Sequence, residues 1–573
     1  MRKMKKFLAL SLSVCMITAS LMACTNKEKE TEKAAETTAE TTEKETSATT
    51  EAGDTDEVAG LDIAVCIGSE PSTIDPTLNT SSDGGMMIEH MFEGLLKRVN
   101  DGQGNAELVL GQAASYEVND EETVYTFTLR DDAMWSDGQK VVADDFVYTW
   151  RRLVDPETAS DYNKIIQMVK NAKAITEGTM EPTELGIVAL DESTLEITLE
   201  SPASYFLQIC AFATTYPVRQ DIIEAYGEQW SRKAETYISN GMYTLESWTH
   251  NSAIKVVASE YYYDQDIIGP NSIEFVLMDD QNAMLAAFRS GELDFIKDMP
   301  ADEIPTLIDN GEIKLWDMLG TYYISFNNEV APFDNPLVRE AFSLAIDRDY
   351  LVNEVLRGGQ APASGFVPSG IYDAAGLAGD DFRTVGGDYI DRGNMEANEE
   401  RARELLAEAG YPNGEGFPTI EYIYNTNDTH RVVGEMFQGM LKEVLNVDIT
   451  LSNQDWSVFL VERKEGNFVM ARNAWIADYN DPTSLLDLAY STNGNNDGNY
   501  SNPAYDALMD EAKVTLDVEK RMEILHQAED LLMSEAGVAP IYFYTDKSMF
   551  NDEYDGLYHS VEGHYYFGEI TRK

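Results

Sequence analysis

The chain has 573 residues, with 101 acidic and 42 basic side chains, so its formal net charge is −59. This balance excludes nucleic acid as an expected partner, because phosphate binding needs clustered Lys and Arg. A hydrophobic fraction of 43% with 10% aromatic residues is typical of folded proteins. At about 150 residues per domain, the length predicts roughly three or four domains.

Cysteine and histidine are both scarce. The four cysteines are too few for a disulfide scaffold, a Cys-rich zinc module or an iron–sulfur protein. The six histidines include no His-x-x-x-His pair, so a zinc hydrolase is not expected. We therefore expect neither a metal nor a cofactor.

The first segment has the pattern of an export signal. Basic residues precede an apolar run over 7–19, which is short for a permanent membrane helix. The run ends at Leu-Met-Ala-Cys24, which resembles a bacterial lipobox, so we expect a signal peptide over 1–23 and lipidation of Cys24. A plain secretory signal cut near Ala23 is the alternative. Residues 24–60 are mostly Thr, Glu, Ala and Lys, which predicts a disordered acidic tether.

Helix and strand patterns alternate through the rest of the chain. Apolar residues at every second position predict strands, and apolar residues at helical spacing predict helices. Asp144 is the expected cap of the first long helix, and Asn335 before Pro336 is the expected start of another. In chain order these patterns predict a strand over 61–67, a strand over 123–130, a helix over 145–154, a strand over 195–199, a helix over 336–346 and a helix over 396–409. The residues therefore predict an α/β or α+β protein with at least two lobes.

A series of motifs resembles a known family. They run in order through the chain: Gly68-Ser-Glu-Pro-Ser-Thr-Ile-Asp-Pro76, Phe92-Glu-Gly-Leu-Leu96, Trp135-Ser-Asp-Gly138, Ser239-Asn-Gly-Met-Tyr-Thr-Leu245, Arg289-Ser-Gly-Glu-Leu-Asp294 and Trp475-Ile-Ala-Asp-Tyr-Asn-Asp-Pro-Thr-Ser484. Together they are similar to the oligopeptide-binding proteins of bacterial ABC importers, within family 5 of the extracellular solute-binding proteins.

The resemblance implies a fold and a division into domains. It implies a two-lobed α/β protein of the periplasmic-binding-protein type (type II, with three domains), a flytrap that encloses its ligand between the lobes. By analogy, the first lobe combines 61–94, 201–318 and 540–573, with 95–200 as an inserted second domain. Residues 319–539 form the opposing lobe.

The resemblance also implies the ligand and the residues that hold its two ends. A peptide of any sequence offers its backbone and two charged ends, so a binder needs a carboxylate for the ammonium and a cation for the carboxylate. The motif Ala-Asp-Tyr-Asn places Asp478 at the peptide amino terminus. Arg472 and His430 match positions that meet ligand carboxylates, with Arg472 always charged and His430 titrating near neutrality. The alternatives are a structural role for Asp478, a surface ion pair for Arg472 and a position at a helix start for His430.

Further residues match positions that line the family's pocket or its rim. Aromatic residues in such patterns also occur as ordinary core, so both interpretations stay open. These further ligand-binding candidates are Trp456, Trp475, Asn240, Tyr323 and Glu70.

The chain departs from one feature of the family. Some members carry a disulfide where this chain has Gly320 and Ile476, so that bridge is not expected. Cys66 and Cys210 remain, either as a pair or as two buried thiols.

The expected function is an extracellular lipoprotein that binds short peptides and delivers them to an ABC transporter permease. We expect a monomer without catalytic activity, on the outer face of the cytoplasmic membrane or in the periplasm where the cell has an outer membrane. The same scaffold binding a cello-oligosaccharide, a nickel chelate or haem is an alternative, and a secreted hydrolase is a second. No Gly-x-Ser-x-Gly, Walker-type loop or His-Glu-x-x-His supports the hydrolase.

Overall fold

The structure is a computed structural model that describes residues 60–102, 105–203, 205–376 and 379–573. The signal peptide, Cys24 and all but the last residue of the acidic tether lie outside the described residues. Within those ranges, no helix has both the length and the apolar character that a membrane span requires.

The longest sheet has eleven strands and runs through the middle of the fold. Its order is β15-β14-β16-β12-β17-β11-β1-β10-β9-β8, with β13 beside β17. These strands are β1 (Asp62–Gly68), β8 (Tyr243–Thr249), β9 (Ala253–Ala258), β10 (Ser272–Leu277), β11 (Phe295–Ile296), β12 (Lys314–Phe326), β13 (Ala361–Pro362), β14 (Ile420–Asn425), β15 (Ile449–Gln454), β16 (Met470–Ile476) and β17 (Val538–Phe550).

Smaller sheets complete the strands. A four-stranded sheet has the order β4-β5-β7-β6, and three two-stranded ladders pair β2 with β3, β18 with β21 and β19 with β20. Their bounds are β2 (Leu96–Asn100), β3 (Ala106–Leu110), β4 (Ala113–Val118), β5 (Val124–Leu129), β6 (Ile187–Ala189), β7 (Thr194–Thr198), β18 (Tyr554–Asp555), β19 (Tyr558–His559), β20 (Tyr565–Tyr566) and β21 (Thr571–Arg572).

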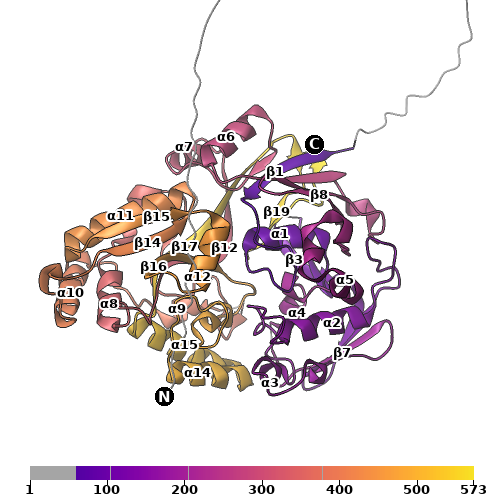
Figure 1. Cartoon of the computed structure of the whole chain (residues 1–573), viewed down its shortest axis with the longest axis horizontal. Helices are drawn as coiled ribbons and strands as arrows, with labels where there is room; N and C mark the ends of the chain where they lie inside the picture. The colour runs from indigo at the N-terminus through magenta and orange to yellow at the C-terminus, as the bar shows by residue number, and fades with distance from the viewer. Residues whose placement is uncertain (1–59, 103–104, 204, 377–378) are drawn as a thin grey trace, which may run out of the picture. The chain divides into compact units, whose positions relative to one another are not determined.

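The helices pack against the long sheet, against the four-stranded sheet and against one another. They are α1 (Ser82–Met91), α2 (Ala143–Val154), α3 (Ala172–Thr176), α4 (Phe206–Ile209), α5 (Gln220–Tyr226), α6 (Gln281–Ser290), α7 (Ile304–Asp309), α8 (Pro336–Leu344), α9 (Phe382–Gly386), α10 (Met395–Glu408), α11 (Asp428–Leu445), α12 (Trp456–Lys464), α13 (Thr483–Leu486), α14 (Pro503–Val514) and α15 (Val518–Ser534). In Figure 1, β12 and β17 lie near the centre, with α8, α10 and α11 on one side and α1, α2 and α5 on the other.

Two large hydrophobic cores correspond to the two lobes. The first core gathers apolar residues of β1, β5, β9, β10 and α2, including the fully buried Trp150, together with the buried Trp135 from the loop between β5 and α2. The second core gathers residues of β12, β14, α8, α10 and α11, including Phe342 and Phe437. We call the parts of the chain around them the first lobe and the second lobe. The protein is therefore a mixed α/β, two-lobed structure, while the domain boundaries by residue number stay a prediction.

Most elements predicted from local patterns are present. The expected strands over 61–67, 123–130 and 195–199 correspond to β1, β5 and β7, and the expected helices correspond to α2, α8 and α10. Asn335 caps α8, because its side chain accepts a hydrogen bond from the Leu337 N–H at 3.0 Å.

The prediction that Asp144 caps the first long helix is wrong. Helix α2 begins at Ala143, and the residue that precedes it is Val142. The carboxylate of Asp145 accepts a hydrogen bond from the Val142 N–H at 3.0 Å, which satisfies a backbone donor at the helix start from inside the first turn.

The cysteine alternatives are also resolved. Gly320 and Ile476 lie directly opposite each other on the antiparallel pair β12 and β16. Cys66 and Cys210 are separate, buried, free thiols. Burial raises the pKa of Cys66 to about 12, so this thiol is not a reactive thiolate.

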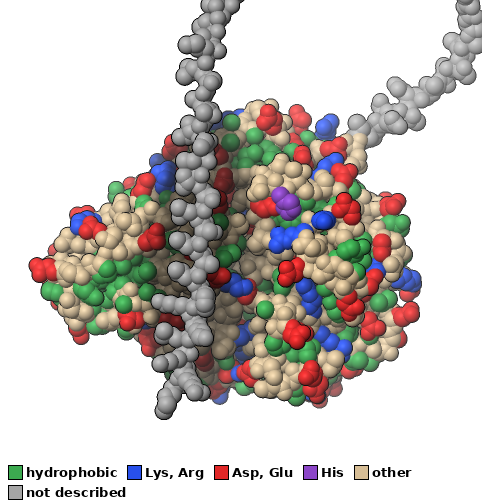
Figure 2. All heavy atoms as spheres, in the orientation of Figure 1, with side chains coloured by type: hydrophobic (Ala, Val, Ile, Leu, Met, Phe, Trp, Pro, Cys, Tyr) green, Lys and Arg blue, Asp and Glu red, His purple; other side chains and the backbone are tan. Residues whose placement is uncertain are grey.

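The acidic excess is distributed over the surface. In Figure 2, Asp and Glu side chains are scattered across the visible face and do not gather in one patch. Carboxylates spread in this way are solvated and repel one another, and their distribution does not by itself mark a binding site.

Candidate ligand-binding site

A cavity of about 280 Å³ lies where the two lobes meet. Its lining includes α1 and Lys297 from the first lobe, Arg472 to Asp478 from the second lobe, and part of β17. Its volume is near the lower end of the range of about 300–1,000 Å³ for small-molecule sites. Both lobes therefore contribute side chains to one partly open cavity.

Strand β16 supplies several residues of this lining. It pairs antiparallel with β12, so that Arg472 lies opposite Ile324 and Trp475 lies opposite Thr321. After the strand ends, the Ala477 N–H still donates to the Leu319 carbonyl at 2.7 Å. The extended course continues almost to Asp478, which places Arg472 and Asp478 at most about 20 Å apart along one stretch of chain.

Asp478 lies in a dry, hydrogen-bonded position. Its Oδ1 accepts a hydrogen bond from the Tyr162 hydroxyl at 2.9 Å, and its Oδ2 accepts one from Ser484 Oγ at 3.4 Å. Its own N–H donates to the same Ser484 Oγ at 2.7 Å. Desolvation by the surrounding protein raises the pKa of Asp478 to about 7, although these hydrogen bonds and His564 act in the opposite direction. A cation that enters the cavity would stabilise the ionised carboxylate and so offset the cost of its desolvation.

Arg472 has no acidic partner within ion-pair distance among the described residues. Its Nη2 donates to the Tyr544 hydroxyl at 3.2 Å, and its guanidinium lies 5.5 Å from the centre of the Tyr322 ring. Its Nε is buried and has no hydrogen-bond partner within the described part of the chain. A buried guanidinium without an anionic partner is costly, so this group suits an anionic ligand.

His430 lies beside Arg472 at the start of α11. Its backbone N–H donates to the capping Asn427 side chain at 3.3 Å, and its ring lies 5.6 Å from the Tyr322 ring. Burial, Arg472 and Lys547 together lower the pKa of His430 well below its ordinary value. The expectation that His430 titrates near neutrality is therefore wrong, because the site desolvates the ring and surrounds it with positive charge.

Trp456 and Trp475 both line the cavity. Trp456 begins α12 and stacks on Phe459 with ring centres 6.1 Å apart. The Trp475 ring lies 6.0 Å from the Tyr162 ring, and the buried Nε1 of Trp475 has no hydrogen-bond partner in the ranges that the structure describes. Five of the predicted residues are thus brought together around one space: Asp478, Arg472, His430, Trp456 and Trp475.

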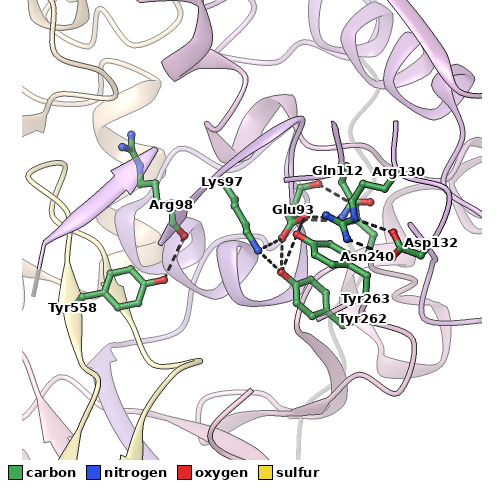
Figure 3. Close-up of polar contacts among 10 residues, drawn as sticks. All are labelled: Glu93, Lys97, Arg98, Gln112, Arg130, Asp132, Asn240, Tyr262, Tyr263 and Tyr558. Carbon is green, nitrogen blue, oxygen red and sulfur yellow. Dashed lines mark hydrogen bonds and ion pairs between the residues drawn. The ribbon is translucent and has the colours of Figure 1, made fainter. Parts of the chain in front are cut away.

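The structure places Asn240 outside the cavity lining. Its side chain accepts from the Glu93 N–H at 3.1 Å and donates to the Glu93 carbonyl at 2.9 Å. The Glu93 carboxylate accepts from Tyr262 at 2.6 Å, Tyr263 at 2.8 Å and Gln112 at 2.9 Å, as Figure 3 shows. Asn240 therefore holds the backbone of the Phe-Glu-Gly motif, a structural role that motif matching could not distinguish from ligand contact.

Tyr323 and Glu70 also lie away from the cavity. Tyr323 is buried and packs edge-on against Phe366, with ring centres 5.2 Å apart. The Glu70 carboxylate accepts from the Asn251 N–H at 2.8 Å and contacts the His250 ring at 2.6 Å. Strand alternation explains Tyr323, because its neighbour Tyr322 faces Arg472 and a one-residue step reverses the face.

Sequence reasoning missed several charged residues of the lining. These are Asp83, Glu89, Arg98, Asp279, Lys297, Asp298, Arg463, Asp546, Lys547, Glu562 and His564. They come from segments far apart in the chain, and no local motif marks them. Tyr162 was missed for the same reason.

Comparison with known proteins identifies the family of this chain. Residues 107–497 match the family described as bacterial extracellular solute-binding proteins, family 5 Middle. The periplasmic oligopeptide-binding protein OppA of Salmonella typhimurium is 35% identical over 489 residues, which cover 84% of this chain and 86% of that protein. This chain belongs to family 5 of the bacterial extracellular solute-binding proteins.

Other members of the family extend the comparison. A crystal structure of Haemophilus influenzae OppA in complex with RPPGFSPFR is 30% identical, covers 90% of this chain and 99% of its own, and has a TM-score of 0.83. The probable deoxycholate-binding periplasmic protein YgiS of Escherichia coli is 32% identical over 83% of this chain and 86% of its own. Members of the family are solute-binding proteins of ABC importers, outside the cytoplasm, and their names include ligands other than peptides.

Proposed function

We propose that this family 5 protein binds short peptides by both ends and delivers them to the membrane subunits of an ABC importer. One observation carries the proposal: Asp478 and Arg472, one an acid and one a cation, line the same cavity on one stretch of extended chain. A zwitterionic peptide has an ammonium and a carboxylate at opposite ends, so both desolvated groups would gain a partner at once.

The edge of β16 supports a peptide backbone as part of the ligand. Strand β12 pairs with β16 from Met470 to Ile476, whereas β14 pairs with it only at Met470 and Ala471. On the edge of β16 that faces away from β12, residues 472–476 therefore have no strand partner among the described residues. An extended peptide can pair with such an edge as an added strand, which gives affinity independent of the peptide's sequence.

Tethering completes the proposed function. Lipidation of Cys24 would anchor the protein at the outer membrane face, and the acidic segment up to residue 60 would let a monomeric binding domain search near its permease. The domain division given above is part of the same proposal. The first lobe and its inserted domain would close against residues 319–539.

A non-peptide ligand is the second candidate, because one relative is named for deoxycholate binding. An anionic steroid would satisfy Arg472 but would leave the Asp478 carboxyl without a cation. Cello-oligosaccharides, haem and nickel chelates also lack an ammonium. The desolvated carboxyl of Asp478 therefore favours an ammonium-bearing ligand over these alternatives.

Two measurements test the proposal. Mass spectrometry of ligands released from protein purified from its own cells should yield short peptides. Calorimetry with one tripeptide, its N-acetylated form and its C-terminal amide should show that both modified forms bind more weakly. Release of a steroid, sugar or haem instead, or equal affinity for all three peptides, would contradict end recognition.

A further inference from the structure

The turn between β19 and β20 projects into the ligand cavity. The Ser560 N–H donates to the His564 carbonyl at 2.9 Å, and the Leu319 N–H donates to the Val561 carbonyl at 2.7 Å. Gly563 has φ of +83°, and a Cβ at this position would lie 2.4 Å from Met318 Cε. The turn is thus fixed on β12 by backbone hydrogen bonds and by close packing that favours glycine.

Two side chains of this turn contact Arg98 on β2 and Glu89 on α1. Glu562 Oε1 lies 3.0 Å from Arg98 Nη2, and His564 Nδ1 lies 2.7 Å from Glu89 Oε2. All four residues line the cavity. Figure 3 shows the Arg98 guanidinium directed away from the Glu93 cluster, so Arg98 is not used by that neighbouring network.

These contacts leave one carboxylate oxygen without a partner. Glu562 is only 8% exposed, and its Oε2 is buried without a hydrogen bond from any residue that the structure describes. The group contains two carboxylates and one permanent cation, Arg98. Burial raises the pKa of Glu89, but His564 and Arg98 outweigh it and leave that pKa below its ordinary value. A buried carboxylate oxygen without a hydrogen-bond donor is strongly unfavourable.

The position of the turn relates it to the ammonium site. A Cβ on Gly563 would lie 3.6 Å from Ile476 Cγ2, and Ile476 is two residues before Asp478. Another buried carboxylate oxygen of the lining without a partner, Asp83 Oδ1, belongs to the start of α1, where the nearby positive charge of Lys297 acts on it. Glu562 is the better acceptor for a ligand cation. Arg98 contacts its Oε1, so Oε2 is left to accept from the ligand.

We propose that Glu562 accepts a basic side chain, Lys or Arg, from a residue at or next to the amino terminus of the bound peptide. This inference rests on the proposed peptide-binding function and names a ligand preference within it. The ligand's ammonium at Asp478 and its basic side chain at Glu562 would then be held by separate carboxylates. Such a ligand would supply the donor that Glu562 Oε2 lacks.

The test compares tripeptides that differ in one charge. Lys-Ala-Ala, Ala-Lys-Ala and Ala-Ala-Lys are titrated by calorimetry beside the same series with norleucine, which keeps the carbon chain and removes the ammonium. We expect one lysine position, the first or the second, to bind about tenfold tighter than its norleucine match. In Glu562→Gln this ratio should fall to near one, because the variant lacks the carboxylate that would pair with the lysine ammonium.

A matched control removes a carboxylate elsewhere. Glu553 is exposed in the same C-terminal segment and is not among the lining residues, so Glu553→Gln should keep the parent ratio. Glu562→Asp keeps the charge on a shorter side chain and should give an intermediate ratio. Thermal unfolding of each variant reports whether it folds. If Glu562→Gln does not fold, the ratio of lysine to norleucine affinity in the parent protein and in Glu562→Asp still tests the proposal.

The outcomes separate this inference from the proposed function. If no tripeptide binds the parent protein, peptide binding itself fails. If norleucine peptides bind as tightly as lysine peptides, or if the lysine preference is unchanged in Glu562→Gln, the acidic subsite is overturned and peptide binding stands. A preference confined to the third position would also overturn it, because that residue lies at the other end of the ligand.

Discussion

The hydroxyl of Tyr162 donates a 2.9 Å hydrogen bond to Oδ1 of Asp478, joining residues 316 positions apart in the sequence. Tyr162 comes from the segment between β5 and β6, and Asp478 follows β16 in the second lobe. Two ion pairs, Lys173 to Asp510 at 2.9 Å and Lys464 to Asp161, join the same two parts of the chain. The carboxyl proposed to receive the ligand's ammonium is thus also a contact between the lobes.

Replacing Asp478 with Asn should weaken binding of peptides with a free amino terminus. The ligand's ammonium would lose its counter-charge in a desolvated site, which costs about 2–4 kcal/mol of binding free energy. Calorimetry with free and N-acetylated forms of one peptide measures this. The variant should bind both forms with similar weak affinity, and a variant that still discriminates between them would place the ammonium elsewhere.

Peptide affinity should rise with pH through neutrality. In the free protein, desolvation raises the pKa of Asp478 to about 7, and Tyr162, Ser484 and His564 face this group. Pairing requires the ionised carboxyl and a protonated amino terminus, whose own pKa is about 8, so binding should release a proton below about pH 7.5 and should weaken as the pH falls from about 7.5 to about 6. Calorimetry in buffers of different ionisation enthalpy measures the proton release. An Asp478→Asn protein should show less release, and equal release would exclude Asp478 as its source.

The same raised pKa has the opposite effect on the stability of the free protein. Between the unfolded value of 3.8 and about 7, the folded chain holds a proton that the unfolded chain has lost. This contribution to stability is full below the unfolded pKa and is lost as the pH rises toward about 7. The free energy of unfolding, measured with denaturant at several pH values for the parent protein and for Asp478→Asn, isolates this contribution of Asp478. A difference between the two proteins that does not change with pH would contradict the shifted pKa.

Removing the Tyr162 hydroxyl should affect both the lobes and the site. Tyr162→Phe deletes the donor to Asp478, so it should raise the pKa of that carboxyl further and cost about 1–3 kcal/mol in unfolding free energy or ligand affinity. Tyr226→Phe is the control, because Tyr226 is 51% exposed. If the two variants behave alike, the hydrogen bond to Asp478 is energetically unimportant.

Arg472 and His430 should differ in how they select ligand length. Arg472→Ala should weaken peptides of one length most, at every working pH, because the guanidinium stays charged. His430 is neutral near pH 7, since burial, Arg472 and Lys547 lower its pKa, so His430→Ala should have an effect that does not change between about pH 6 and 8. A titration of di- to pentapeptides with amidated controls tests both. A His430 effect that appears only in acid would contradict the lowered pKa.

Several features of this protein follow from the sequence by itself. The helix at Asn335-Pro336 and the alternating strand β5 depend on neighbours within a few residues, so local patterns are enough to predict them. Ordered motifs indicated the family, and with it the placement of Asp478 and Arg472 on one segment near the end of β16. Strand geometry carries these two residues into the same cavity, because they share a single extended stretch.

The tertiary structure alone decided the surroundings of these residues. The partner of Asp478 is Tyr162, the neutral state of His430 comes from burial beside Arg472, and Asn240 binds the Glu93 backbone in place of a ligand. Each result depends on contacts between segments far apart in the chain, or on desolvation, which is a property of the whole fold. A residue's chemistry can be expected from its type, but its charge state and its partners are set by what folding places against it.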